Sequence, residues 1–280
     1  MSISSRTIEV NGVRLHVEDT GGAGPPVVFS HGLLLSARTW DAQVEALRGG
    51  FRCISYDHRG QGQSGAPGDG DLGLDACTAD AAGLIEALRL GACHFVGLSM
   101  GGFVGMRLAA RRPELLASLS LVETSADEES AADLRRYRLM TLTARVLGPW
   151  AVAGKAMPVL FGRTFLADPA RREEVSSWKR RIASNRRDIW RAAAGAVLDR
   201  AGVHEELARI RAPTLVVVGE EDVATPRARA DRIVARIPGA RLALIPRAGH
   251  TAPVEAPTEV TAVLREFLES QRRTTIVPAR

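Results

Sequence analysis

Short apolar runs alternate with helical patterns through most of the chain, and this alternation restricts the fold more than any other feature. Residues 26–30, 52–56 and 93–97 are strand-like, and each run is followed by a loop and a segment with helical periodicity. Apolar runs of this kind are typical of parallel strands that are buried under helices on both faces of a sheet. The sequence therefore predicts an α/β fold with a mostly parallel central sheet flanked by helices.

The chain begins differently, with strand-like residues 7–10 and 13–18 joined by Asn11-Gly12. An Asn-Gly pair between two such runs predicts an antiparallel hairpin closed by a type I′ turn. The sheet as a whole is therefore expected to be mixed. Further strands are predicted at residues 115–122, 213–219 and 241–245, and helices at residues 39–47, 74–90, 101–112, 226–237 and 254–270.

Residues 125–210 interrupt the alternation. This segment is typical of several helices, with breaks near Gly148-Pro149, Met157-Pro158, Gly162 and Asp168-Pro169. We therefore predict an α/β core made of residues 1–124 and 211–280, with residues 125–210 inserted as a helical cap.

Positive charge is concentrated in the predicted cap. Residues 131–200 contain 15 Lys and Arg but 6 Asp and Glu, whereas the whole chain has a net charge of +5. These basic residues are dispersed and lack the interleaved aromatic residues or recognition-helix pattern of a nucleic-acid interface. We expect a solvated basic surface and no nucleic-acid partner, with attraction of an anionic substrate as the second interpretation.

The overall composition is that of an ordinary globular chain, with 45% hydrophobic and 25% charged residues. The first 20 residues have no apolar signal-peptide core, and no run of 18 apolar residues occurs, so we expect no membrane association and a cytoplasmic location. The three cysteines, Cys53, Cys77 and Cys93, lack metal-binding spacing and are predicted to be reduced core residues.

A Gly-x-Ser-x-Gly motif, Gly97-Leu98-Ser99-Met100-Gly101, lies between a predicted strand and a predicted helix. A serine on such a sharp turn needs strained backbone angles, and side chains two residues on either side would collide, which explains both glycines. The start of the following helix directs free N–H groups at the serine and favours an oxyanion there. Ser99 is therefore the candidate nucleophile.

A serine nucleophile needs a base, and the base needs an acid that fixes its tautomer. His250 follows the last predicted strand, at the edge of the sheet where open parallel sheets bind their ligands. His58 is the alternative base. For the acid, four carboxylates lie at the ends of strands, namely Asp222, Glu220, Glu221 and Glu123.

An oxyanion needs two backbone N–H donors. One is predicted to be the amide of Met100, directly after the nucleophile, and the other the amide of Leu33 in the loop that follows residues 26–30. His31 is then expected to shape that loop rather than to act as a base.

Together these motifs resemble the α/β-hydrolase superfamily over nearly the whole chain. The resemblance depends on His31-Gly32, the loop 57–64, the elbow 97–102, the segment 219–222 and Gly249-His250. The family's chain order of serine, acid and histidine is met by Ser99, Asp222 and His250, so the resemblance implies that Asp222 is the acid. It also implies that residues 125–210 are the family's lid.

Four features indicate which branch of the superfamily the chain resembles. Ser99 argues against haloalkane dehalogenases and epoxide hydrolases, which use an aspartate nucleophile, and Leu98 replaces the asparagine usual in carbon–carbon bond hydrolases. The elbow and the lid spacing look most like 3-oxoadipate enol-lactonases and cofactor-free perhydrolases or esterases. In perhydrolases a proline often follows His-Gly, where this chain has leucines.

The resemblance implies a serine hydrolase that cleaves an ester or lactone of a small molecule, which could be anionic, through an acyl-enzyme and without a cofactor. The alternatives are perhydrolase or haloperoxidase-like activity, a lyase-like reaction, and ligand binding without catalysis. The oligomeric state, including a homo-oligomer, stays open. Five apolar residues are candidates for the pocket wall: Leu33, Leu34, Leu35, Trp40 and Trp150.

Overall fold

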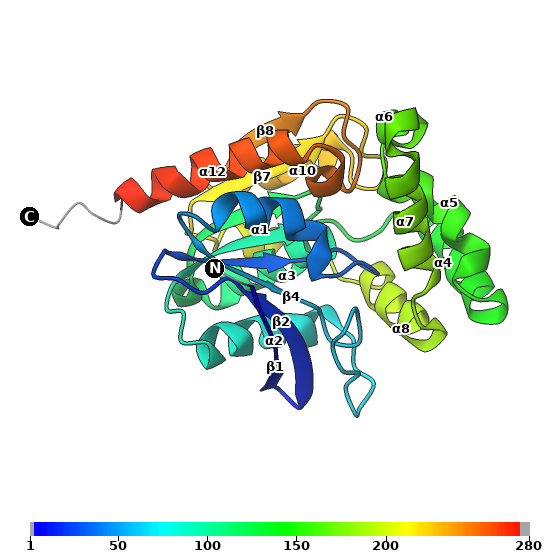
Figure 1. Ribbon diagram of the computed structural model, residues 1–280, viewed down its shortest axis with the longest axis horizontal. Helices are drawn as coiled ribbons and strands as arrows, with labels where there is room; N and C mark the ends of the chain where they lie inside the picture. The colour runs from blue at the N-terminus through cyan, green and yellow to red at the C-terminus, as the bar shows by residue number, and fades with distance from the viewer. Residues whose placement is uncertain (1–2, 275–280) are drawn as a thin grey trace, which may run out of the picture.

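The computed structural model describes residues 3–274. Its centre is an eight-stranded sheet with the strand order β1-β2-β4-β3-β5-β6-β7-β8 (Figure 1). The first two strands, β1 (Ser4–Val10) and β2 (Val13–Asp19), form the predicted antiparallel hairpin. The turn residues Asn11 and Gly12 both have positive φ, 48° and 72°, as a type I′ turn requires.

The other six strands are parallel to one another. They are β3 (Pro26–Ser30), β4 (Arg52–Tyr56), β5 (Cys93–Leu98), β6 (Leu116–Val122), β7 (Thr214–Gly219) and β8 (Arg241–Ile245). The chain runs outward from β3 to β4, then crosses back to β5 on the other side of β3. The loops after β3 and β5 therefore leave the sheet in opposite directions, and this switch point is where α/β sheets bind ligands.

Helices cover both faces of the sheet, as the continuous apolar runs predict. Helices α1 (Asp41–Leu47) and α12 (Pro257–Thr274) pack together on one face, and α2 (Leu74–Ala87), α3 (Met100–Arg111) and α10 (Arg227–Val234) on the other (Figure 1). Alternate residues of β7 enter two hydrophobic cores. Val216 and Val218 pack in the core under α2, α3 and α10, and Leu215 and Val217 pack in the core under α1 and α12.

The segment between β6 and β7 is helical. It contains α4 (Ala131–Leu147), α5 (Trp150–Leu160), α6 (Arg163–Ala167), α7 (Arg172–Ala183), α8 (Arg187–Leu198) and α9 (His204–Leu207). Helices α4 to α8 gather beyond one end of the sheet, at the right of Figure 1. That residues 125–210 form a cap with these boundaries stays a prediction.

Two details of the sequence prediction were wrong. The chain does not break at Pro158, which lies inside α5 and only two residues before its last residue, so that the missing N–H disturbs just the end of the helix. The predicted closing helix is two helices, α11 (Ala252–Glu255) and α12. Pro257 begins α12 and disfavours helical angles at Ala256, which has φ −131° and ψ 62°.

Three short 3₁₀ helices complete the structure: η1 (Ala37–Trp40), η2 (Pro113–Leu115) and η3 (Pro169–Arg171). Cys53, Cys77 and Cys93 are buried free thiols, as predicted. Among residues 3–274 we find no helix with the length and apolar character that a membrane span needs.

Candidate active site

Ser99 occupies the sharp turn between β5 and α3. Its backbone angles, φ 50° and ψ −109°, are strained for a residue other than glycine. Hydrogen bonds hold the strained unit, because the Ser99 N–H donates to Val122 O and the Thr124 hydroxyl donates to Ser99 O, both at 2.8 Å. A side chain on Gly97 would collide with the carbonyl of Gly101, so the predicted need for glycine is physical here.

His250 lies in the loop between β8 and α11, at the same edge of the sheet as Ser99. Its Nε2 is 2.9 Å from the Oγ of Ser99, and its Nδ1 is 2.9 Å from Oδ2 of Asp222. The His250 and Asp222 side chains are buried, with 7% and 0% exposure. The structure thus brings together the predicted nucleophile, acid and base, although Ser99 and Asp222 are 123 residues apart along the chain and Asp222 and His250 are 28 apart.

Asp222 lies in the turn after β7, and its carboxylate accepts several hydrogen bonds besides that of His250. Oδ1 accepts the N–H groups of Ala224 and Thr225, and Oδ2 accepts the Thr225 hydroxyl at 2.6 Å. Burial by itself would raise the pKa of Asp222, but the charge of His250 and hydrogen bonds from its neighbours outweigh burial and lower that pKa. Asp222 is therefore ionised where it contacts the imidazole, and Thr225, which the sequence did not indicate, helps to hold it.

Within the described part of the chain, the structure shows no hydrogen bond between His250 and any of the three other acid candidates. Glu220 is exposed, and Glu221 accepts hydrogen bonds from Arg163 and Thr164 of α6. Glu123, at the end of β6, is completely buried, and its carboxyl group accepts the N–H of Gly219 and is hydrogen-bonded to Asp222.

The predicted second oxyanion loop lies directly beside the nucleophile. Ser30, the last residue of β3, pairs with Gly97, and a Cβ added to Gly32 would lie 3.4 Å from the Cβ of Ser99. The carbonyl of Gly32 accepts hydrogen bonds from His31 Nδ1 at 2.7 Å and from the Leu35 N–H at 3.2 Å. In a trans peptide the next N–H points opposite to that carbonyl, so the Leu33 amide is turned away from both donors. His31 therefore shapes the loop, as expected.

Gln61 is a further residue of this region, and the sequence analysis did not single it out. Its Oε1 accepts the Leu34 N–H at 2.7 Å, and its Nε2 donates to the sulfur of Met100 at 3.7 Å. Gln61 therefore joins the loop after β3 to the first turn of α3, which carry the two predicted oxyanion donors. The flanking glycines Gly60 and Gly62, both with positive φ, were the sequence signal for a loop folded this tightly.

The alternative base, His58, is held in a buried cluster behind this loop. Its Nε2 lies 3.0 Å from the hydroxyl of Ser30, which also contacts the Tyr56 hydroxyl, and burial lowers the pKa of His58 far below its ordinary value. His58 thus belongs to the structural support of the sheet edge.

A cavity of about 150 Å³ opens beside Ser99 and His250. Its walls are mainly apolar and come from the loop after β3 and from α4, α5 and α8; they include Leu33, Leu34, Leu35, Phe103, Tyr137, Met140, Leu160, Trp190 and Leu198. The two tryptophans suggested by the sequence are absent from this wall. Trp40 is packed in the core against Phe29, and Trp150 points to solvent with 67% exposure.

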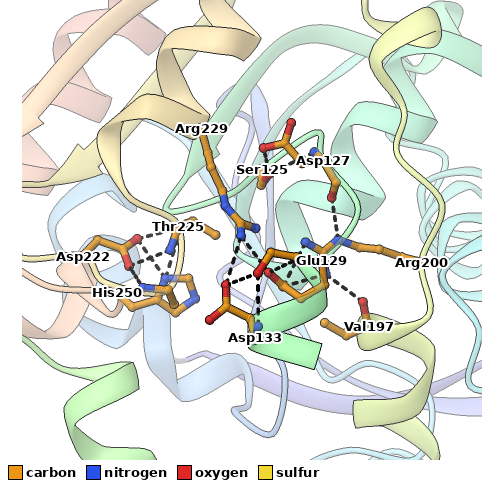
Figure 2. A network of polar contacts seen from close by, with 12 residues as sticks. Ser125, Asp127, Glu129, Asp133, Val197, Arg200, Asp222, Thr225, Arg229 and His250 are labelled. Atoms are coloured by element: carbon orange, nitrogen blue, oxygen red, sulfur yellow. Dashed lines mark hydrogen bonds and ion pairs between the residues drawn. The ribbon is translucent and has the colours of Figure 1, made fainter. Parts of the chain in front are cut away.

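A buried charge cluster contributes two residues to the cavity wall. Glu129 accepts hydrogen bonds from Arg200 at 3.2 and 3.3 Å and from Arg229 at 2.7 Å (Figure 2). Glu129 and Arg200 line the cavity, while Figure 2 shows Arg229 between them and the Asp222–His250 pair. Within residues 3–274, no three His, Cys, Asp or Glu side chains are grouped as metal ligands.

Comparison with known proteins identifies the family. Residues 27–263 match the α/β hydrolase family, which is 237 of the 280 residues. The chain belongs to the α/β hydrolase family. The eight-stranded sheet and its flanking helices are those of other α/β hydrolases, so both the predicted fold and the predicted family are confirmed.

Several of the similar proteins are named as hydrolases. The chain is 30% identical over 252 residues to the protein named "Putative carbamate hydrolase RutD" of Rhizobium rhizogenes, covering 88% of this chain and 93% of the relative. Among solved structures, an enol-lactonase from Burkholderia xenovorans superposes with a TM-score of 0.87 at 28% identity, over 94% of this chain and 100% of that one. A thermophilic esterase from Thermogutta terrifontis superposes with a TM-score of 0.86 at 32% identity, over 97% and 99%. These findings support a hydrolase.

Proposed function

We propose that this α/β hydrolase is a serine hydrolase that cleaves a carboxylic ester or lactone of a small molecule through an acyl-enzyme. The observation that best supports the proposal is a continuous series of contacts. Asp222 Oδ2 contacts His250 Nδ1, and His250 Nε2 contacts Ser99 Oγ, at 2.9 Å in both cases and beside an apolar cavity. This is the arrangement by which a serine hydroxyl becomes a nucleophile.

The proposed reaction uses this series twice. Ser99 Oγ attacks the substrate carbonyl carbon while His250 Nε2 takes the hydroxyl proton, and the ionised Asp222 stabilises the resulting imidazolium. The Met100 and Leu33 amides donate hydrogen bonds to the oxyanion. His250 then returns the proton to the leaving alkoxide. Next it removes a proton from the water that attacks the acyl-enzyme, and it gives this proton to Ser99 Oγ as the bond from the acyl carbon to that oxygen breaks and the acid product leaves.

The size and the apolar wall of the cavity favour a substrate with a small apolar acyl or alcohol group. Its charged residues are one of each sign, because Glu129 lies against Arg200, so we propose that shape and apolar contact select the substrate. The names of the two structural neighbours, an enol-lactonase and an esterase, support an ester or lactone carbonyl. A lactone that carries a carboxylate is the second substrate class, to be compared with uncharged esters and lactones.

The decisive experiment is trapping of the acyl-enzyme. The purified protein is mixed with a series of short p-nitrophenyl esters, aryl esters and lactones, then quenched and analysed by intact and peptide mass spectrometry. We expect a burst of p-nitrophenol and an acyl group on the peptide that contains Ser99. Ser99→Ala should lose the adduct and about 10⁶-fold in kcat, as nucleophile deletions do in other serine hydrolases.

The control is Ser36→Ala, in the loop after β3, which should keep both the burst and the adduct. Hydrolysis by Ser99→Ala at the wild-type rate would contradict the nucleophile assignment. Turnover of hydrogen peroxide with a carboxylic acid, and none of esters or lactones, would instead favour the perhydrolase alternative.

A further inference from the structure

A second buried carboxyl group touches the acid of the proposed active site. Glu123 follows β6 directly, with a positive φ of 44°, and its side chain is 0% exposed. Both of its oxygens lie within hydrogen-bond distance of the Gly219 N–H, at 2.8 and 3.0 Å. The same carboxyl group is hydrogen-bonded to the carboxyl group of Asp222. The mechanism proposed above gives Glu123 no part.

Both side chains are 0% exposed, and two buried carboxyl groups in contact do not both ionise, so the pair holds a proton. The surroundings decide which member holds it. Asp222 receives four hydrogen bonds from N–H and hydroxyl donors of Ala224, Thr225 and His250, all of which favour a carboxylate. Within residues 3–274, Glu123 accepts a backbone or side-chain N–H from Gly219 alone. The proton therefore belongs to Glu123.

The other charged groups around the pair agree with this assignment. His250, from the loop after β8, faces Asp222, and its positive charge in the reaction would stabilise an ionised Asp222. Glu255, from α11, is the third buried carboxyl group nearby, and its charge disfavours ionisation of Glu123. Burial comes first, followed by the charge of Asp222, among the causes that raise the pKa of Glu123 well above its ordinary value of 4.5.

We propose that Glu123 is protonated in the folded enzyme and donates this proton in a hydrogen bond to Asp222, as a positioning residue for the proposed catalytic acid. The hydrogen bond orients the Asp222 carboxylate and withdraws part of its negative charge, so it tunes how strongly Asp222 attracts the proton on His250. The inference rests on the proposed function for its catalytic consequence, but the protonation state itself is independent of that function.

The first test measures stability and needs no activity. Glu123→Gln replaces a protonated carboxyl group by an amide that can still accept the Gly219 N–H and donate to Asp222. In the unfolded chain Glu123 ionises above pH 4.5, while the folded chain must keep it protonated, so the wild type loses stability relative to Glu123→Gln as the pH rises. We expect the urea midpoint of Glu123→Gln to move above that of the wild type progressively between about pH 5 and about pH 8. A midpoint difference that stays constant over this range would overturn the proposal.

Glu255→Gln is the matched control. The Glu255 carboxylate accepts backbone N–H groups with both oxygens, from Gly162 and Gly249 on Oε2 and from Thr251 on Oε1. An amide there must direct its own N–H groups at a donor, so Glu255→Gln should lower the urea midpoint where Glu123→Gln does not. Equal losses in the two variants would show that Glu123, like Glu255, serves only as an acceptor of N–H groups, and would overturn the proposal.

The second test uses the acidic limb of the kcat/KM profile, which reports the pKa of the base in the free enzyme. Glu123→Leu removes the donor, leaves Asp222 with more negative charge, and should move the limb to higher pH by about half a unit to one unit. Glu123→Gln should restore the wild-type limb. A shift of the Glu123→Gln limb to lower pH would mean that a negative charge had been removed, and would overturn the proposal.

Failure of this inference and failure of the proposed function are separable. If Ser99 forms no acyl-enzyme, the function is wrong, while the urea series still reports the state of Glu123. If Ser99 is acylated and the midpoint difference does not change with pH, the inference alone is wrong. Should Glu123→Leu not fold, the comparison of Glu123→Gln with the wild type decides both tests.

Discussion

The backbone N–H of His58 donates a hydrogen bond to Nε2 of His31, 3.0 Å away. The other ring nitrogen of His31 must then carry the proton that it donates to the Gly32 carbonyl, so both contacts require the neutral Nδ1–H tautomer. Burial lowers the pKa of His31 and keeps the ring neutral. One imidazole thereby joins the loops after β3 and β4 and orients the peptide whose N–H is the proposed Leu33 donor.

His31→Leu should therefore impair catalysis more than substrate binding. It leaves the His58 N–H without its acceptor and frees the peptide between Gly32 and Leu33, so we expect kcat to fall about 10²- to 10³-fold, the cost of losing one oxyanion donor. Steady-state kinetics on an ester that acylates Ser99 would measure this effect. His16→Gln, a change on β2, is the control, and an unchanged kcat in folded His31→Leu would show that the ring does not orient the donor.

Alanine at the glycines of the elbow should affect stability very differently from alanine at a glycine with open space around it. A Cβ on Gly101 would collide with the backbone and side chain of Ser30, and one on Gly97 would collide with the backbone of Gly101. We expect Gly97→Ala and Gly101→Ala each to lower the free energy of unfolding by several kcal/mol, of the order of overpacking in a rigid core. Gly195→Ala, in α8 with nothing within 4 Å of the added Cβ, should instead raise it by up to about 1 kcal/mol. Urea unfolding of the three variants would test the contrast, and similar values would contradict it.

Neighbouring residues on α4 separate the cavity wall from the surface. Met140 lines the cavity, whereas the side chain just before it, Leu139, is 65% exposed. We expect Met140→Ala to raise kcat/KM for longer acyl chains relative to acetyl by about tenfold, because the shorter side chain enlarges the cavity. Leu139→Ala should leave that ratio within about twofold. An identical ratio in the two variants, measured over a series of p-nitrophenyl esters, would show that the acyl group lies elsewhere.

Buried histidines predict a loss of stability in mild acid. Burial, with a smaller effect of Arg272, lowers the pKa of His94 from 6.5 to about 4, and its Nδ1 contacts the hydroxyl of Ser118 at 2.8 Å. Between these pH values the unfolded chain binds a proton that the folded chain does not, so stability falls as the pH falls from 6.5 towards 4. At 1.36 kcal/mol per pKa unit the contribution of His94 is about 3 kcal/mol.

His94→Gln should make the dependence on pH shallower in that window, as measured by urea unfolding at pH values between about 4 and about 7. His31 and His58, whose pKa values burial also lowers, should keep part of the slope in the variant. A slope equal to that of the wild type would show that His94 does not contribute to it.

Features with a local cause were predictable from the residues alone. The Asn11-Gly12 turn and the strand–serine–helix elbow depend on steric limits within a few residues, and the strands follow from apolar runs that need cover on both faces. Where the sequence was wrong, packing decided. Trp40 and Trp150 are the same residue type, yet one fills the core beside Phe29 and the other is exposed.

The sequence by itself determined an α/β sheet with a serine raised on a strained turn at one edge, because glycine spacing and apolar periodicity act over short distances. The residues alone left four carboxylates that follow strands as candidates for the acid, and only the family resemblance singled out Asp222. The tertiary structure brought Asp222 against His250 and, by setting β6 beside β7, placed Glu123 beside Asp222, because no local pattern fixes the pairing of segments that lie far apart in the sequence.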